Sequence, residues 1–170
     1  MHPVRADAHA NTGCVGEDDV HRRRGGRARS PVAGTPTVRE NRGVDGETMQ
    51  RRAALRADEL PGASLEHPFG PDFDVFKVCG KVFMLMSDLR GTPIVTVKSA
   101  PADGSVLREA YPEITPGYHM NKRHWITITG GGALAPGLLD DLVTESYLLV
   151  VETLPRRLRP VDPATFGRRA

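Results

Sequence analysis

The segment from Phe73 to Ser99 restricts the fold more than any other part of the sequence. It holds three apolar runs, FDVFKVC, KVFMLMSD and PIVTVKS, separated only by Gly80 and by the turn LRGT. Short runs of this kind, divided by glycine, predict β-strands joined by tight turns. In the second run Val82, Met84 and Met86 alternate with Phe83 and Leu85, so we expect a central strand covered on both faces. The three runs together predict an antiparallel meander.

Helical patterns flank the meander. We expect helices from Asp45 to Leu60, from Asp103 or Ser105 to Tyr111, and from Pro136 to Val151. Asp45 can cap the first helix, and Pro136 suits the first turn of the last. HWITITG, residues 124–130, is a further strand with Ile126 and Ile128 on one face. Residues 114–117 form an edge strand or an extended loop, and residues 64–72 an irregular link. The fold class is α+β, a mostly antiparallel sheet with helices packed on one face.

The two ends of the chain differ in composition from its middle. Residues 1–43 form an Arg/Gly-rich segment without hydrophobic periodicity, so we expect it to be disordered. Residues 44–155 form the α+β domain, and residues 156–170 a basic flexible tail. The net charge of +2 comes from the ends, since residues 47–155 hold more acidic than basic side chains.

Several classes of protein are excluded by what the sequence lacks. It has no apolar run of about 18 residues, so we expect no membrane partner. The first residues contain no apolar core of a secretory signal, so we expect a cytoplasmic protein. The two cysteines, Cys14 and Cys79, lack the spacing of a zinc site, and we expect free thiols.

The densest group of functional side chains lies in PGYHMNKRHWITI, residues 116–128. As a nucleic-acid contact, Lys122 and Arg123 would bind phosphates, His119 and Asn121 would reach base edges, and Tyr118 or Trp125 would stack. If the run is instead a structural turn, the side chains of Lys122 and Arg123 would be solvated. Trp125 is the single tryptophan of a small core, so we expect it to be buried.

Two other interpretations use the histidines. His119 and His124 could serve as general acid and base, but no nucleophile elbow or H-E-x-x-H pattern accompanies them, so we expect no enzyme and no cofactor. A metal site would recruit three histidines and an aspartate, namely His67, His119 and His124 with Asp72 or Asp74, at spacings that do not require a metal. The segment HPFGPD could line a ligand pocket with the 116–128 run or plug the open end of the sheet.

Three blocks carry a resemblance to a known family: LPG at 60–62, EHPFGPDFDVFKVCGKVFML at 66–85, and PGYHMNKRHWITI. In this order they resemble the MmcQ/YjbR family of small bacterial proteins over residues 44–155. The resemblance implies a frataxin-like α+β topology with a double-wing DNA-binding surface. It implies contacts from Lys77, Lys81, His119, Asn121, Lys122, Arg123 and His124, with Phe69 and Trp125 shaping the surface.

We therefore expect a non-catalytic protein that binds duplex DNA weakly or locally, because residues 47–155 are acidic overall. The alternative is a small-ligand or protein-interaction module on the same surface. The expected contact residues are Lys77, Lys81, Tyr118, His119, Asn121, Lys122, Arg123, His124 and Trp125. The first expected helix has no acidic ridge, which argues against iron, and the oligomeric state is not predicted. We also expect residues 1–43 to be an upstream extension, with a GTG start codon read as Val44.

Overall fold

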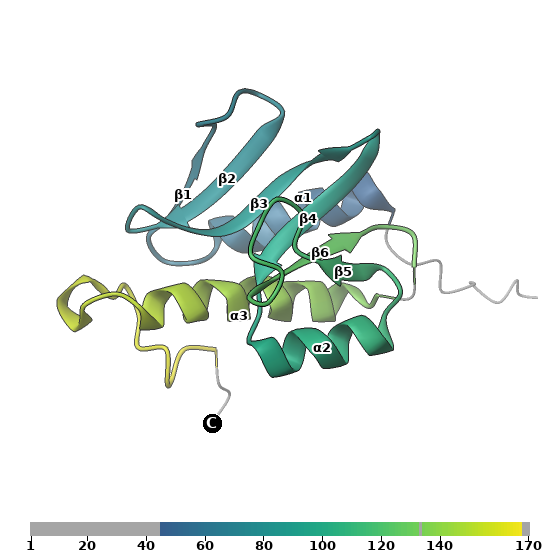
Figure 1. Ribbon diagram of the computed structural model, residues 1–170. Coiled ribbons are helices and arrows are strands. Elements are labelled where there is room, and N and C mark those ends of the chain that lie inside the picture. The colour runs from purple at the N-terminus through teal and green to yellow at the C-terminus, as the bar shows by residue number, and fades with distance from the viewer. Residues whose placement is uncertain (1–44, 133, 168–170) are drawn as a thin grey trace, which may run out of the picture. The chain divides into compact units, whose positions relative to one another are not determined.

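Six antiparallel strands in the order β1-β2-β3-β4-β6-β5 form one sheet in the computed structural model, which describes residues 45–132 and 134–167 (Figure 1). The strands are β1 (Ala63–Glu66), β2 (Phe73–Val78), β3 (Lys81–Leu89), β4 (Thr92–Lys98), β5 (Ile114–Pro116) and β6 (Trp125–Thr129). The helices are α1 (Gly46–Asp58), α2 (Pro101–Ala110), α3 (Pro136–Glu152) and the short 3₁₀ helix η1 (Arg156–Leu158). The predicted α+β class is confirmed.

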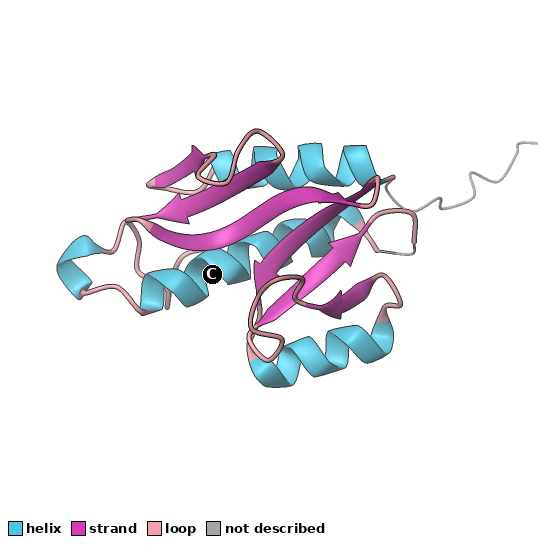
Figure 2. Ribbon diagram, turned by 45° about the horizontal axis from the view of Figure 1, so that its top comes forward, coloured by secondary structure: helices cyan, strands magenta, loops and turns pink. Residues whose placement is uncertain are grey.

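The hydrophobic core lies between the sheet and its helices, which cover one face (Figure 2). Met49 and Ala53 of α1 and Val143 and Tyr147 of α3 pack there against the strands. The core includes Ile126 and Ile128 of β6, whereas Trp125 and Thr127 belong to the other face. This is the alternation that the sequence of β6 predicts.

Strand β3 departs from the predicted pattern in two ways. The pairing of β2 with β3 shifts register between Phe76 and Lys77, and the resulting bulge places Phe83 beside Met84 in the same core. The expected alternation of Phe83 with Met84 is therefore wrong. The expected cover on both faces of β3 is also wrong, because the helices of the described residues lie on one side and Leu85 on the other is half-buried.

A serine of α3 joins β3 to β4 where the two strands separate. Their pairing ends at Met84 and Val97. Beyond this pair, the buried Ser146 hydroxyl donates to Phe83 O at 2.5 Å and accepts from Lys98 N at 2.7 Å. The hydroxyl thus replaces the direct bond between strands and lets the β2–β3 turn diverge from the end of β4.

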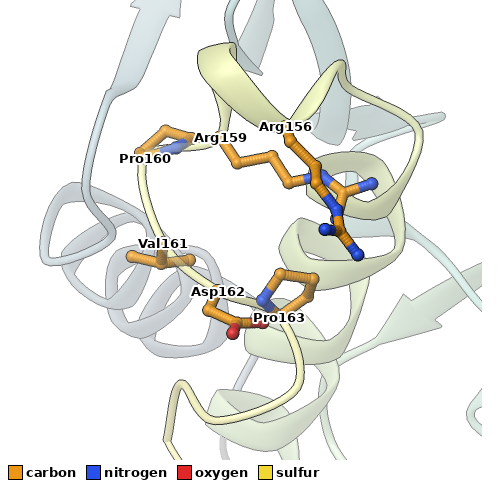
Figure 3. Close-up of a pocket in the computed structure, with 6 residues that line it drawn as sticks. All are labelled: Arg156, Arg159, Pro160, Val161, Asp162 and Pro163. Carbon is orange, nitrogen blue, oxygen red and sulfur yellow. The ribbon is translucent and has the colours of Figure 1, made fainter.

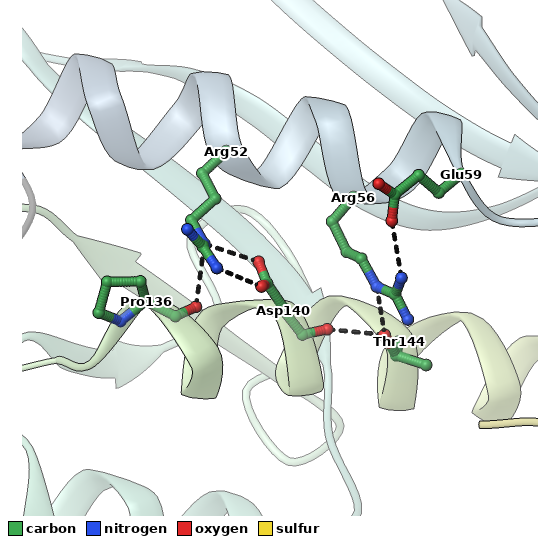
Figure 4. A network of polar contacts seen from close by, with 6 residues as sticks. All are labelled: Arg52, Arg56, Glu59, Pro136, Asp140 and Thr144. Atoms are coloured by element: carbon green, nitrogen blue, oxygen red, sulfur yellow. Dashed lines mark hydrogen bonds and ion pairs between the residues drawn. The ribbon is translucent and has the colours of Figure 1, made fainter. Parts of the chain in front are cut away.

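Two arginines of α1 fix this helix against α3 (Figure 4). Arg52 binds both carboxylate oxygens of Asp140, at 2.9 and 2.5 Å, and donates to Pro136 O. Arg56 donates to Thr144 Oγ1 and pairs with Glu59. The hydrogen bond to Asp140 raises the pKa of Arg52. The Arg52–Asp140 contact is bidentate, a geometry that orients one helix on the other.

Asp45 caps α1 as the sequence predicts. Its Oδ1 accepts from Thr48 N at 2.9 Å and its Oδ2 from Thr48 Oγ1 at 2.8 Å. The bond from the Thr48 backbone, then that from its hydroxyl, hold the pKa of Asp45 below its ordinary value of 3.8. A carboxylate with a depressed pKa stabilises the fold above its unfolded pKa, and this contribution disappears as pH falls through the folded pKa.

We predict that Asp45→Ala lowers the melting temperature at pH 7, because the first turn of α1 loses its cap. The difference from wild type should shrink as the pH falls below about 3.8, the unfolded value. Asp45→Asn is the control, since asparagine caps without a charge and its difference from wild type at pH 7 should be smaller. Equal melting temperatures for wild type and Asp45→Ala at pH 7 would contradict the prediction.

Two elements differ from the sequence-based expectation. Residues 63–66, placed mostly in an irregular link, form the edge strand β1, whose side chains are mainly exposed. Helix α2 begins at Pro101 after Ala100, two residues before the expected Asp103 cap. Proline at the first helical position needs no amide partner, so this helix starts without a side-chain cap.

The C-terminal segment also differs from the flexible tail expected at residues 156–170. Val161 and Phe166 pack against the core, and the Phe166 and Tyr147 ring centroids lie 6.1 Å apart. The described residues of this segment are therefore attached to the domain through Val161 and Phe166, while most of the other side chains are exposed. The expectations for residues 1–43, for Cys14 and for Val44 lie outside the described residues. None of the described helices is long and apolar enough to cross a membrane.

Candidate nucleic-acid interface

Two strand connections lie at the same end of the sheet. The β2–β3 turn is formed by Cys79 and Gly80, next to the pair Val78 and Lys81. The β5–β6 loop, residues 117–124, follows Pro116, which pairs with Ile126. The pairing of β4 shows that the two connections lie at the same end of the sheet, because Val97 pairs with Met84 of β3 on one side and with Ile126 of β6 on the other. We call this the turn end of the sheet.

Backbone contacts fix the β5–β6 loop against β6. Gly117 N donates to Trp125 O, and Tyr118 N donates to Thr127 Oγ1, both at 2.8 Å. Thr127 Oγ1 also lies 2.8 Å from Thr96 Oγ1, so a buried hydroxyl pair supports the start of the loop. Both ends of the loop are therefore attached to the sheet.

Asn121 shapes the tip of this loop. Its Oδ1 accepts from Arg123 N at 2.9 Å, and its carbonyl accepts from His124 N at 3.1 Å. His124 O in turn accepts from Ser99 N at 3.0 Å, just before α2. The side-chain amide nitrogen of Asn121 remains as a donor, but its oxygen is used within the loop.

The loop presents aromatic and cationic side chains to solvent. The rings of Tyr118 and His119 are in contact in a tilted arrangement, with centroids 4.0 Å apart, and both side chains are exposed. Lys122, Arg123 and His124 are also exposed. Among residues 45–132 and 134–167, no ion pair or side-chain hydrogen bond occupies Lys122 or Arg123. These two cations are available to an anionic partner.

Trp125 is buried, as its sequence context predicts, with 7% of its surface exposed. It lies on the face of the sheet away from the helices, and Lys98 Nζ stands 5.3 Å from the ring centroid. The ring thus supports the base of the loop and holds a cation above it. Lys98 was not among the expected contacts, because only the pairing of β4 with β6 brings it here.

The two lysines expected from the β2–β3 turn are less available. Lys77 Nζ pairs with Glu66 Oε2 at 2.5 Å, and its side chain is 18% exposed. Lys81 is exposed, and its Nζ donates to Thr153 Oγ1 at 3.1 Å. Cys79 Sγ contacts Leu158 O at 3.3 Å, which brings η1 and its exposed Arg157 beside the turn. Arg157 was missed because the sequence predicted a detached tail.

Phe69, which the family resemblance places at the contact surface, lies at the opposite end of the sheet. Its segment connects Glu66, opposite Val75, to Phe73, opposite Ser87, which is the far end of the sheet. Phe69 is 69% exposed and meets the Phe73 ring edge-on. The interpretation that HPFGPD lines a pocket with the β5–β6 loop is wrong, because the length of β2 separates them.

The described residues contain no group of three histidine, cysteine, aspartate or glutamate side chains arranged to hold a metal ion. His67, one of the expected ligands, pairs with Asp74 at 2.8 Å at the far end of the sheet. His119 and His124 are exposed on the loop, away from His67. His67 therefore does not lie with His119 and His124, as the metal hypothesis requires.

A sequence model of the YjbR family matches residues 58–149, more than half of the chain. The chain belongs to the YjbR family. The uncharacterised protein YbdF of Escherichia coli O157:H7 is 46% identical over 114 residues, covering 67% of this chain and 93% of YbdF. YjbR of Escherichia coli K12, also uncharacterised, is 31% identical over 83 residues, covering 49% of this chain and 70% of YjbR.

Two solved structures resemble this YjbR-family chain. Protein DR2400 of Deinococcus radiodurans aligns with a TM-score of 0.63 at 29% identity, covering 78% of this chain and 99% of DR2400. A protein from Pseudomonas syringae aligns with a TM-score of 0.51 at 26% identity, covering 59% of this chain and 95% of that protein. The family match includes both connections of the turn end and stops before η1.

Proposed function

We propose that this YjbR-family chain is a non-catalytic, cytoplasmic protein that binds duplex DNA through the turn end of its sheet. The observation that carries the proposal is the β5–β6 loop, where Lys122 and Arg123 are exposed and unpaired among the described residues. Side chains of this type supply most of the affinity of proteins for the phosphate backbone.

The distribution of charge supports this assignment. At the turn end the cations are Lys81, Lys98, Lys122, Arg123 and Arg157. The far end carries Asp72, Asp74 and Asp88, beside the start of β2 and the end of β3. A chain that is acidic overall between residues 47 and 155 thus still presents a cationic end, and the repulsion by the far end keeps DNA affinity low.

The start of α2 brings the first backbone amide groups of a helix to the same region, and Asp103 in this turn offsets part of their positive potential. Helix α2 follows Ser99, which contacts His124 O, and its first turn has no side-chain cap. The first amide groups of a helix attract anions. A phosphate held by Lys122 or Arg123 would lie on this side of the sheet.

The alternative is a small-ligand or protein-interaction module on Tyr118, His119, Asn121 and Trp125 rather than on the cations; because Trp125 is buried, its partner would contact the three exposed side chains. The exposed Tyr118–His119 ring pair is the observation that favours it. Such a module would respond to changes in the rings and would be insensitive to salt. The two proposals therefore differ in their dependence on charge.

We predict that Lys122→Ala/Arg123→Ala weakens binding of the full chain to labelled duplex DNA, measured by fluorescence anisotropy across a salt series. Removing two phosphate contacts should lower the log–log salt slope by about two. The matched control is Arg51→Ala/Arg90→Ala, which removes two exposed arginines from α1 and from the β3–β4 turn at the far end. This control should leave the slope unchanged.

This experiment distinguishes DNA binding by the β5–β6 loop from DNA binding by the arginines at the two ends of the chain, because every variant retains those ends. Equal slopes for wild type and Lys122→Ala/Arg123→Ala would show that these two loop cations do not contact DNA, and would contradict the proposal. Binding that depends on Tyr118→Ala but not on salt would favour the ligand module.

A further inference from the structure

The segment after α3 forms a hollow that lies apart from the proposed DNA contacts of the β5–β6 loop. It has a volume of about 430 Å³ and is lined by Arg156, Arg159, Pro160, Val161, Asp162 and Pro163 (Figure 3). A hollow of this size suits a small ligand rather than a macromolecule. It lies beyond residues 58–149, the part of the chain that matches the family.

The wall of the hollow is fixed by packing. Pro160 lies against Gly62, where an added Cβ would be 3.0 Å from the Pro160 ring. Val161 packs on the core. Asp162 accepts Ala164 N on Oδ1 and Phe166 N on its carbonyl, both at 2.9 Å. The hollow is therefore formed before any ligand arrives, which reduces the entropy lost on binding.

Arg159 is held in place while keeping free donors. Its Nε donates to Leu154 O at 2.9 Å, and one terminal nitrogen donates to Glu152 O at 2.7 Å. These bonds satisfy carbonyls at the end of α3 and use two of the five N–H groups of the guanidinium. The remaining N–H groups are oriented by the first two.

Arg156 supplies a second guanidinium to the same hollow. Its side chain and that of Arg159 extend along one side of it (Figure 3). Within the described part of the chain, neither arginine forms an ion pair with a carboxylate. Two like charges beside one hollow favour an anion between them, and guanidinium groups match the oxygens of a phosphate.

Asp162 limits which anion fits. Its carboxylate lines the hollow together with the arginines, so it repels an anion that has no hydrogen-bond donor of its own. A phosphate ester with a neighbouring hydroxyl satisfies both features. We propose that this hollow binds a sugar phosphate, with the phosphate on Arg156 and Arg159 and a sugar hydroxyl donating to Asp162.

The test is a titration of the full ¹⁵N-labelled chain with ribose 5-phosphate, followed by NMR. Saturable shifts are expected for the backbone amides of the non-proline residues between positions 156 and 165. Arg156→Gln should weaken binding about tenfold, the effect of losing a charged hydrogen bond. The matched control is Arg51→Gln, which removes an exposed arginine of α1 that does not line the hollow and should leave the dissociation constant unchanged.

A second variant tests the sugar hydroxyl. Asp162→Asn keeps an oxygen for Ala164 N but removes the charge, so it should bind inorganic phosphate more tightly than wild type and lose preference for ribose 5-phosphate. The absence of saturable shifts would overturn the proposal. Equal weakening by Arg156→Gln and Arg51→Gln would also overturn it, as would wild-type affinity for inorganic phosphate equal to that for ribose 5-phosphate.

The ribose phosphate of an RNA chain has the same chemistry, so a short single-stranded RNA is a further arm. Tighter binding of RNA than of ribose 5-phosphate at the same amides would support the site and identify RNA as the source. Tighter binding of ribose 5-phosphate would support the site and identify a free sugar phosphate. The DNA titration of Lys122→Ala/Arg123→Ala is independent of both results, so either proposal can fail alone.

Discussion

Replacing Ser146 by alanine should lower the free energy of unfolding by about 2–4 kcal/mol. The Ser146 hydroxyl is buried and bonds two backbone groups, Phe83 O at 2.5 Å and Lys98 N at 2.7 Å. Alanine would leave an acceptor on β3 and a donor on β4 without this partner. Each such buried group costs about 1–3 kcal/mol, and the change is measurable by urea denaturation.

Ser99→Ala provides the matched control for this prediction. Ser99 is also buried, but within the part of the chain that the structure describes its hydroxyl bonds only the adjacent Ala100 O, at 3.2 Å. Its loss should change the free energy of unfolding by less than about 1 kcal/mol. A similar small effect of Ser146→Ala would mean that water or a strand shift replaces the bridge, and the role assigned to Ser146 would be wrong.

Local signals account for the parts of the fold that the sequence predicted correctly. Asp45 caps α1, glycine at position 80 allows the tight turn between β2 and β3, and the alternation in β6 separates Trp125 from Ile126. Each of these depends on residues close together in sequence. The order in which strands pair is not local, so the insertion of β6 between β4 and β5 was not predicted.

The missed elements lack such signals. Strand β1 reads ASLE, so its apolar and polar residues alternate over only four positions, and most of its side chains are exposed, which is too little to distinguish a strand from an irregular link. Helix α2 starts with proline after alanine and has no capping side chain. Among residues 156–167, only Val161 and Phe166 pack against the core as hydrophobic side chains, too few to predict this attachment among arginines and prolines.

In the candidate site, too, some features follow from the local sequence and others depend on how distant strands pair. Lys122 and Arg123 are exposed, which both interpretations of the 116–128 run, a phosphate contact and a solvated turn, predict. The availability of Lys77 could not be predicted, because its ion pair with Glu66 requires β1 to lie beside β2. The sequence could not place Lys98 over Trp125 either, since their contact depends on pairing across the α2 connection.

The β5–β6 loop should be displaced by Gly117→Ala, with a loss of about 2–4 kcal/mol in the free energy of unfolding. A Cβ at Gly117 would lie 2.5 Å from Trp125 Cβ and 3.0 Å from Trp125 O. Both atoms belong to or adjoin the backbone of β6, so the loop must move instead. Movement would break the bonds from Gly117 N to Trp125 O and from Tyr118 N to Thr127 Oγ1.

Trp125 reports this displacement directly, because it is the single tryptophan of the chain and is buried. Its fluorescence should shift to the red in Gly117→Ala, and DNA affinity should fall if the loop carries the contact. Gly137→Ala is the control: nothing lies within 4 Å of its Cβ position in the first turn of α3, and alanine there should be neutral or stabilising by up to about 1 kcal/mol. Unchanged emission and stability in Gly117→Ala would show that the loop tolerates a side chain here, and that its attachment to β6 does not position Lys122 and Arg123.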